Sequence, residues 1–196
     1  MSSAGASSLV VHAGRLRLDP YRPADCRELY AIRYHPTVRS FMSRPALATY
    51  ESHRAWTRSQ LVEGAPLRLW LVRHVDHPRA IGFTQLRFDP MGDSDEIGVM
   101  FREPACHTQA AIVVGALTLH LAFVELGCRE LRSYVVEGHP RALAFNRAGG
   151  AVEVPSDRPG LVRLQLAREA CLTHPNFLKV MARCRLRGMR VVVTPD

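Results

Sequence analysis

Two groups of residues in the middle of the sequence are of types that can do chemistry. Glu96 opens the apolar stretch EIGVMF, where its carboxylate could accept a proton as a general base; the alternative is a solvated carboxylate at a strand edge. Thr108, Gln109, Ala110 and Ala111 begin a long apolar segment. Because the N–H groups at a helix N-terminus are unpaired and can hold a phosphate, these residues form either an anion cradle or an ordinary helix start.

The elements that must position these residues alternate between strand and helix patterns. Strands are predicted at 15–19, 67–75, 80–89, 96–101, 130–137, 151–154 and 161–167, and helices at 24–33, 50–63, 110–127 and within 139–151. Short turns make the three middle strands an antiparallel meander, and the long helix then supplies a crossover to a parallel neighbour. We therefore expect an α/β (α+β) fold, with a central mixed, mostly antiparallel sheet and helices on both faces.

The chain length favours a single domain. A length of 196 residues with 47% hydrophobic content suffices for one sizeable core. We expect a disordered tail at 1–14, a domain at 15–167, and a C-terminal helix-strand extension at 168–196 packed on the same domain. No function is assigned to the extension.

The net charge of +8 comes almost wholly from arginine, because Lys179 is the only lysine. Such a bias is more typical of genome composition than of a binding function. Arginines occur in nearly every segment, whereas nucleic-acid binding normally shows as a basic patch within a recognised module, so we do not expect a nucleic-acid partner. A basic surface does suit an anionic ligand.

The cysteines, the apolar runs and the N-terminal segment argue against a metal site, a membrane span and a signal peptide. The five cysteines are scattered without the spacing of a metal or redox motif, so we expect reduced thiols and no metal site. No apolar run approaches the roughly 20 residues of a membrane span. The N-terminal MSSAGASS lacks the basic and apolar regions of a signal peptide, and we expect a cytoplasmic protein without a membrane partner.

The segment HPRALAFNRAGGA resembles a signature of the GNAT-type N-acetyltransferase superfamily, Asn-Pro-Arg-Ala-Ile-x-x-Tyr-Glu-Lys-x-Gly-Phe. The two agree without a gap at Pro140, Arg141, Ala142, Leu143, Phe145 and Gly150, and they differ at His139, Asn146 and Ala151. The order of elements over about 15–167 resembles the same family. The segment AIRYHPTVRSFM resembles the branch that acetylates ribosomal proteins, antibiotics or amino sugars.

The resemblance implies acetyl-CoA as the acyl donor and assigns residues to it. The backbone of Val99, Met100 and Phe101 would bind the pantetheine arm, and the glycine-poor turn from Thr108 to Ala111 would hold the pyrophosphate. Two further residues would lie near the coenzyme, either contacting it or merely exposed or capping a helix: His139 and Asn146.

The resemblance also implies how protons move. An alkyl amine with a pKa near 10.4 is deprotonated to only about one part in two thousand at pH 7, so an assisting base is useful, and Glu96 stands where the family places one. Asn146 replaces the tyrosine that acts as general acid in the family, and asparagine cannot do so. Tyr134 is a spare proton donor, with a structural role as its alternative.

The acceptor side would be formed by the first two helices. Arg33, His35 and Arg39 could receive an anionic acceptor such as a nucleotide sugar, or they are solvated helix faces. We expect an N-acetyltransferase that moves an acetyl group directly to a primary amine of a small molecule or protein, as a monomer or homodimer. The alternative is a degenerate GNAT-like domain that senses acyl-CoA or serves as a scaffold, and Gln109 and Asn146 favour it.

Overall fold

The computed structural model describes residues 9–40, 42, 48–61, 64–102 and 108–194. Its strands are β1 (Leu9–Ala13), β2 (Leu16–Pro20), β3 (Leu67–His74), β4 (Gly82–Phe88), β5 (Ser94–Phe101), β6 (Glu130–Val136), β7 (Val152–Val154), β8 (Leu161–Ala167) and β9 (Arg190–Val193). Its helices are α1 (Cys26–Arg33), α2 (Pro36–Arg39), α3 (Tyr50–Gln60), α4 (Thr108–His120), α5 (Pro140–Ala148), α6 (Arg168–Thr173) and α7 (Pro175–Leu186), with a 3-10 turn η2 (Pro23–Asp25) and a π-helical turn η4 (Leu121–Glu125).

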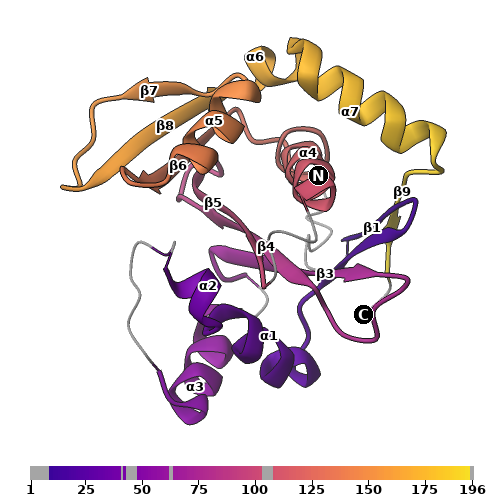
Figure 1. Cartoon of the computed structure of the whole chain (residues 1–196), viewed down its shortest axis with the longest axis vertical. Helices are drawn as coiled ribbons and strands as arrows, with labels where there is room; N and C mark the ends of the chain where they lie inside the picture. Colours follow the sequence, from indigo (N-terminus) through magenta and orange to yellow (C-terminus); the bar gives the residue numbers. More distant parts are fainter. Residues whose placement is uncertain (1–8, 41, 43–47, 62–63, 103–107, 195–196) are drawn as a thin grey trace.

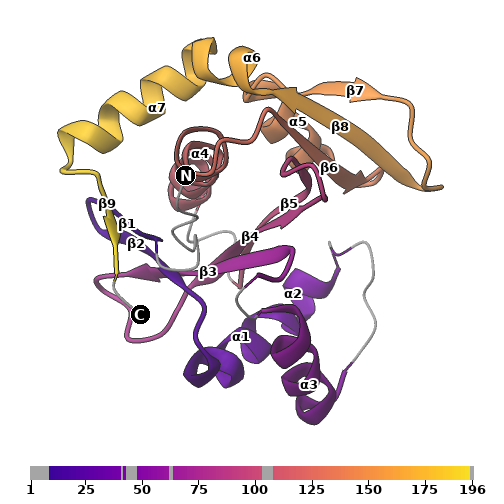
Figure 2. The same ribbon diagram turned by 180° about the vertical axis from the view of Figure 1, so that it is seen from behind.

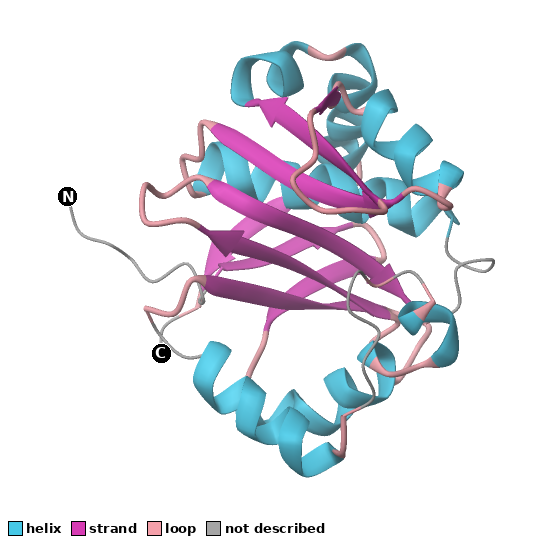
Figure 3. Cartoon of the chain, turned by 90° about the vertical axis from the view of Figure 1, so that its left-hand side faces the viewer, coloured by secondary structure: helices cyan, strands magenta, loops and turns pink. Residues whose placement is uncertain are grey.

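One sheet joins the described strands in the order β7-β8-β6-β5-β4-β3-β2-β1-β9. Neighbouring strands run antiparallel except β5 and β6, which pair in parallel because α4 crosses over between them. Helices lie on both sides of this sheet, as the side view shows (Figure 3). The predicted fold class is therefore confirmed.

Different helices cover the two faces of the sheet (Figures 1 and 2). On one face α4 packs against the strands and α7 packs against α4; on the other lie α1, α2 and α3. Since successive strand residues point to opposite faces, the core divides in two: Leu86 joins Leu117 of α4, whereas Leu71 and Phe83 join α1. The sequence of α4 is apolar all round because the sheet and α7 bury it from both sides.

A group of charges ties α1 to the sheet. Arg73 of β3 pairs with Asp19 (Nε–Oδ2 3.0 Å), Asp25 (Nη2–Oδ1 3.1 Å) and Glu28 (Nη2–Oε2 3.0 Å). Glu28 also accepts the N–H of Ala80 through Oε1 at 2.6 Å. These contacts join β2, β3 and α1, and so fix the helix that forms one wall of the cleft described below.

The two ends of the chain differ from the sequence predictions. The prediction of a disordered tail at 1–14 was wrong for residues 9–13, which form β1. Residues 1–8 lie outside the described ranges. β1 pairs with β2 on one side and with β9 on the other, from Leu9↔Val193 to His12↔Arg190. The extension therefore closes the sheet at this edge.

The predicted C-terminal helix is interrupted at one point. Pro175 has no N–H with which to continue the turn, and it forces His174 into an extended conformation (ψ 127°), so α6 ends and α7 begins there. The buried side of α7, formed by Phe177, Met181 and Cys184, then packs into the same core as α4.

Several features relevant to metals and membranes can be stated for the described part of the chain. None of its helices combines the length and apolar character needed to cross a bilayer. Within the same ranges, His, Cys, Asp and Glu side chains form no group of three that could hold a metal ion. Cys26, Cys128, Cys171 and Cys184 are free and buried, and Cys106 lies outside these ranges.

Candidate active site

β5 separates from β6 soon after it begins. In the described residues the two strands share one ladder position, Ser94↔Leu131. A bulge between Ser94 and Glu96 gives β5 one extra residue relative to β4, and such a bulge bends the strand that carries it. Beyond the bulge, β5 follows β4 and leaves the side of its backbone that faces β6 outside the ladder.

Val99 and Phe101 turn their backbone groups toward this side. The N–H of Arg102 donates to the carbonyl of Ile81 at 3.1 Å, and bonding in an antiparallel ladder alternates residue by residue. Met100 therefore bonds β4, whereas Val99 and Phe101 direct N–H and C=O away from it. An extended arm that carries amide groups can add to such an edge as a further strand.

The start of α4 lies at the end of this strand, after a segment outside the described residues. Gln109 is exposed there, and Ala110 and Ala111 are half-buried. Two hydroxyl groups fix the helix on the sheet: Thr84 Oγ1 donates to the carbonyl of Gly98 at 3.0 Å and lies 2.8 Å from Thr118 Oγ1 of α4. The phosphate cradle at this helix start stays a prediction.

α5 carries the other residues predicted to contact the coenzyme. Asn146 donates from Nδ2 to the carbonyl of Ala142 at 2.8 Å, so half of its amide is used within its own helix. His139 precedes α5, and burial, followed by the charge of Arg141, lowers its pKa. This shift favours the neutral ring and weakens the idea of a charged phosphate donor; contact of either residue with the coenzyme stays a prediction.

A cleft of about 530 Å³ opens on the opposite face of β5, between the sheet and α1 and α3. Glu96 and Met100 line it, because they point to the face opposite Val99. The Glu96 side chain is 42% exposed, and it accepts hydrogen bonds from Gln85 (Nε2–Oε1 3.0 Å) and Arg87 (Nε–Oε2 3.4 Å). The base candidate is therefore held in place and still reachable from the cleft.

Gln85 of β4 is the most buried polar side chain in the cleft wall, at 7% exposed. Its amide orientation follows from its partner, because Glu96 is a carboxylate and can only accept the Nε2 hydrogens. Gln85 Oε1 is then buried, with no hydrogen-bond partner in the described structure. A donor brought by a ligand or a water molecule would satisfy this oxygen.

Three arginines are among the residues that line the cleft, and two of them rest on aromatic rings. Arg33 of α1 stacks over Trp56 at 4.5 Å, and Arg158, from the connection between β7 and β8, stacks over Tyr134 at 3.9 Å. Burial lowers the pKa of Arg33, the mark of a guanidinium that has lost part of its hydration.

The other sequence candidates have different surroundings. Tyr134 lies beside the cleft rather than in its wall, and its hydroxyl donates to Asp157 at 2.8 Å. Burial and this bond raise its pKa. Arg39 belongs to α2 and His35 precedes it, and neither lines the cleft. His35 Nδ1 is buried and has no hydrogen-bond partner within the described ranges. Of the three predicted acceptor residues, the structure brings Arg33 alone to Glu96.

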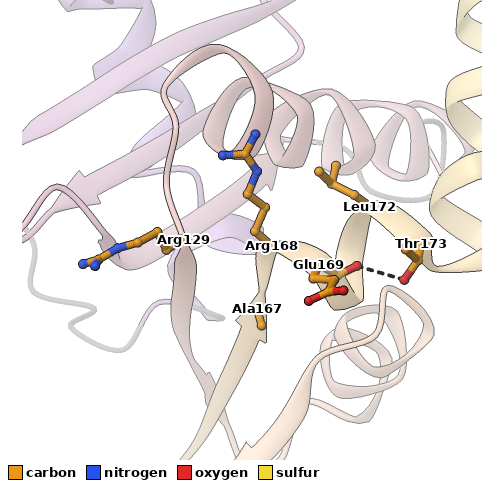
Figure 4. A pocket seen from close by; sticks show the side chains of 6 residues that line it. All are labelled: Arg129, Ala167, Arg168, Glu169, Leu172 and Thr173. Atoms are coloured by element: carbon orange, nitrogen blue, oxygen red, sulfur yellow. Dashed lines mark hydrogen bonds between the residues drawn. The ribbon is translucent and has the colours of Figure 1, made fainter.

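A second hollow of similar volume, about 530 Å³, lies beside α6 (Figure 4). Its polar groups do not converge: Arg129 points away and pairs with Asp93 at 2.8 Å, and the Thr173 hydroxyl donates to the backbone of Glu169 at 2.9 Å. It also lies away from the separated edge of β5, so we place the chemistry in the first cleft.

Sequence reasoning missed several residues of the cleft wall, among them Gln85, Arg87 and Arg158. Gln85 and Arg87 alternate with apolar residues in AIGFTQLRFD, and this alternation places them on one face of β4. That pattern could have found them once the face carrying Glu96 was known. Arg158 comes from a connection whose position only the folded chain reveals.

Comparisons with known proteins agree with this arrangement. The family described as acetyltransferase (GNAT) domain matches residues 15–152. No curated protein matches the chain significantly. A solved structure described as an acetyltransferase is 25% identical with a TM-score of 0.63, and covers 91% of this chain and 96% of its own.

Two other solved structures share the fold at lower identity. One, also described as an acetyltransferase, from T. thermophilus, is 24% identical with a TM-score of 0.64 over 91% of this chain and 96% of its own. A chimera of spermidine N-acetyltransferase SpeG from Vibrio cholerae and hSSAT is 14% identical with a TM-score of 0.69, over 81% of this chain and 99% of its own. With a domain match over most of its length, a separated pair of central strands and a polar cleft beside them, the chain belongs to the GNAT acetyltransferase family.

Proposed function

We propose that this protein is an N-acetyltransferase that transfers an acetyl group from acetyl-CoA directly to a primary amine within a ternary complex. The observation that carries the proposal is the position of Glu96, in a cleft on one face of β5, beside a strand edge suited to an extended thioester arm. Family membership supplies the acyl donor, because GNAT acetyltransferases use acetyl-CoA.

The reaction exchanges a C–S bond for a C–N bond and removes two protons from the amine. Glu96 takes the first proton from the ammonium, directly or through water, which leaves the nitrogen neutral for attack on the thioester carbonyl. As the C–N bond forms and the C–S bond breaks, coenzyme A leaves as a thiolate and the nitrogen releases its second proton to water or to that thiolate. The backbone N–H of Val99 would stabilise the oxyanion that develops on the carbonyl.

The coenzyme would lie along the β6 side of β5 and reach the start of α4. Val99 and Phe101 would bind the pantetheine arm through their backbones, while the N–H groups from Thr108 to Ala111 would face the pyrophosphate. Met100 contributes its side chain to the acceptor cleft rather than its backbone to the coenzyme, since β4 uses that backbone. His139 and Asn146 would lie near the coenzyme at the start and middle of α5.

The departing thiolate needs a proton. Tyr134 is a candidate donor, but its hydroxyl would first have to give up its hydrogen bond to Asp157 and turn to the thiolate. Because a coenzyme A thiol is acidic enough to leave as the thiolate and collect a proton from water, turnover does not depend on this tyrosine.

A polyamine acceptor, as named for the SpeG structures, is not what we propose for this chain. Spermidine is a polycation, whereas Glu96 is the one carboxylate among the described residues of the cleft wall and three arginines accompany it. Like charges at short range would disfavour several ammonium groups in the same cavity. The acceptor is therefore expected to carry few positive charges beyond the reacting amine.

A regulatory role is the second candidate, in which the domain binds acyl-CoA without turning it over. Gln109 favours it, because this exposed side chain stands where the family has a glycine that lets backbone amides approach the phosphates. The two functions share coenzyme binding and differ in product formation.

Calorimetric titration with acetyl-CoA, joined to a thiol-release assay, separates the candidates. We expect micromolar binding that Gln109→Glu weakens at least tenfold, about 1.4 kcal/mol, because the new charge faces the pyrophosphate. Gln109→Ala is the matched control and should retain binding. Binding without thiol release for any amine would favour the regulatory role, and no binding at millimolar acetyl-CoA would refute both.

A further inference from the structure

The charge balance of the acceptor cleft is positive. Arg33, Arg87 and Arg158 line it, and Glu96 is the carboxylate that opposes them in the described wall. Arg87 is already engaged, through its bond to Glu96 and a 3.4 Å bond from Nη1 to Gln60 Oε1. Arg33 and Arg158 make no ion pair with a carboxylate within 4.0 Å in the described part of the chain.

Both of these arginines are held by the faces of their guanidinium groups. Trp56 supports Arg33, and Tyr134 supports Arg158. A guanidinium stacked on a ring keeps its N–H groups in the plane of the fork, where they can bind two oxygens of a carboxylate or phosphate at once. Arg33 is partly buried and Arg158 is exposed, so for Arg33 a ligand that brings an anion would also offset part of the cost of burying the cation.

Glu96 and Gln85 offer the amine contacts of a different kind from those of the arginines. Glu96 can accept the proton of an amine, and the unpartnered Oε1 of Gln85 calls for a hydrogen-bond donor. A cavity of about 530 Å³ is within the usual size of a small-molecule site. Hydrogen-bond acceptors, from Glu96 and Gln85, and hydrogen-bond donors, from the arginines, therefore line one cavity that is large enough for a single compact molecule.

We propose that the acceptor is a small molecule carrying an oxyanion, phosphate or carboxylate, in addition to its amine. Arg33 and Arg158 bind the oxyanion, while Glu96 and Gln85 receive the amine. The inference rests on the proposed function, since it names the class of acceptor for the same site.

The test uses pairs of probes that differ only in the oxyanion. Glucosamine 6-phosphate is compared with glucosamine, and β-alanine with β-alaninamide, so the two pairs separate a phosphate site from a carboxylate site. Each probe is titrated calorimetrically into the full chain saturated with coenzyme A, and each is then offered with acetyl-CoA in a thiol-release assay. In each pair the member with the oxyanion is called the anionic probe and the member without it the neutral probe, by the group that differs and not by net charge. We expect at least one anionic probe to bind tenfold or more tightly than its neutral counterpart.

Variants locate the preference. Arg158 lies on an exposed connection, so Arg158→Gln should fold normally and reduce the preference for the anionic probe at least fivefold, with less than a twofold change for the neutral one. Arg33→Gln should act in the same direction. Arg79→Gln removes the same charge from an exposed turn outside the cleft and should leave the preference unchanged.

Three results would overturn the inference: equal binding within both pairs, no binding of either anionic probe at millimolar concentration, or an equal loss in Arg79→Gln and Arg158→Gln. The last would mean that the overall positive charge, rather than the cleft, attracts the probe. Acetylation of both members of a pair without preference would overturn the oxyanion site and leave the proposed function intact. Preferential binding of an anionic probe without acetylation of any probe would support the oxyanion site and contradict the proposed acetyltransferase function.

Discussion

His53 of α3 should make the stability of this protein fall at mildly acidic pH. Its side chain is fully buried, and both ring nitrogens lack hydrogen-bond partners among the described residues. The rings of Tyr30, Tyr34 and Trp56 lie 5.4 to 5.5 Å from its ring. Burial, followed by the charge of Arg33, lowers the pKa of His53 from 6.5 to about 4. The folded state therefore keeps this histidine neutral.

The size of the effect follows from this difference in pKa. The unfolded chain takes up a proton on His53 near pH 6.5, whereas the folded chain does so near pH 4. Between these values the unfolded state binds more protons, so the free energy of unfolding decreases as the pH falls, by about 1.36 kcal/mol per unit. The stabilising contribution is fully present above pH 6.5. Going from pH 7.5 to pH 5.0 lowers the free energy of unfolding by about 2 kcal/mol.

The measurement is urea denaturation of wild type and His53→Phe at several pH values between 5.0 and 7.5. The variant should be at least as stable as wild type at pH 7.5, because it removes two unpartnered buried nitrogens. Between pH 7.5 and pH 5.0, the free energy of unfolding should fall by about 2 kcal/mol less in the variant than in wild type. The lowered pKa values of His12, His120 and His139 affect both proteins alike and cancel in the comparison. Parallel pH profiles for the two proteins would refute the reasoning.

Three further predictions concern the sheet and the site. A Cβ at Gly82 would overlap the carbonyl oxygen of Met100, which is backbone and cannot move aside, so Gly82→Ala should lower the free energy of unfolding by about 1–3 kcal/mol in urea denaturation; an unchanged midpoint would contradict this. Arg73→Met should lower the free energy of unfolding by about 2 kcal/mol in urea denaturation at pH 7, because Asp19, Asp25 and Glu28 would lose their shared partner; an unchanged midpoint would contradict this. Glu96→Gln should reduce kcat by about a hundredfold or more, whereas a change in KM alone would indicate a role in binding only.

The sequence predicted the fold where local patterns agree with tertiary packing. β7 and β8 coincide with segments in which apolar and polar residues alternate between turn residues. The apolar sequence of α4 indicated burial on more than one side. β1 escaped prediction because it is short and lies between β2 and β9, a strand from the other end of the chain. β9 was expected as the strand of the C-terminal extension, but its pairing with β1 was not. Such long-range pairing leaves little local signal.

The site was predictable in part for a similar reason. Glu96 and Arg33 were identified from residue type and position, and the structure places both in one cleft. Gln85 needed the register of β4 against β5, in which Arg87↔Glu96 sets its face, and Arg158 needed the path of a connection between distant strands. His35 and Arg39 were selected by proximity in sequence, and the helices turn both away from the cleft wall.

Product formation tests the central claim most directly. The protein would be incubated with acetyl-CoA and the four amine probes, with thiol release followed over time and the acetylated amine identified by mass spectrometry, for wild type and Glu96→Gln. The account predicts one acetylated amine for each thiol released, with glucosamine 6-phosphate or β-alanine preferred over its neutral counterpart and a large loss of kcat in Glu96→Gln. Tight binding of acetyl-CoA with no acetylated amine, or an unchanged kcat in Glu96→Gln, would contradict it.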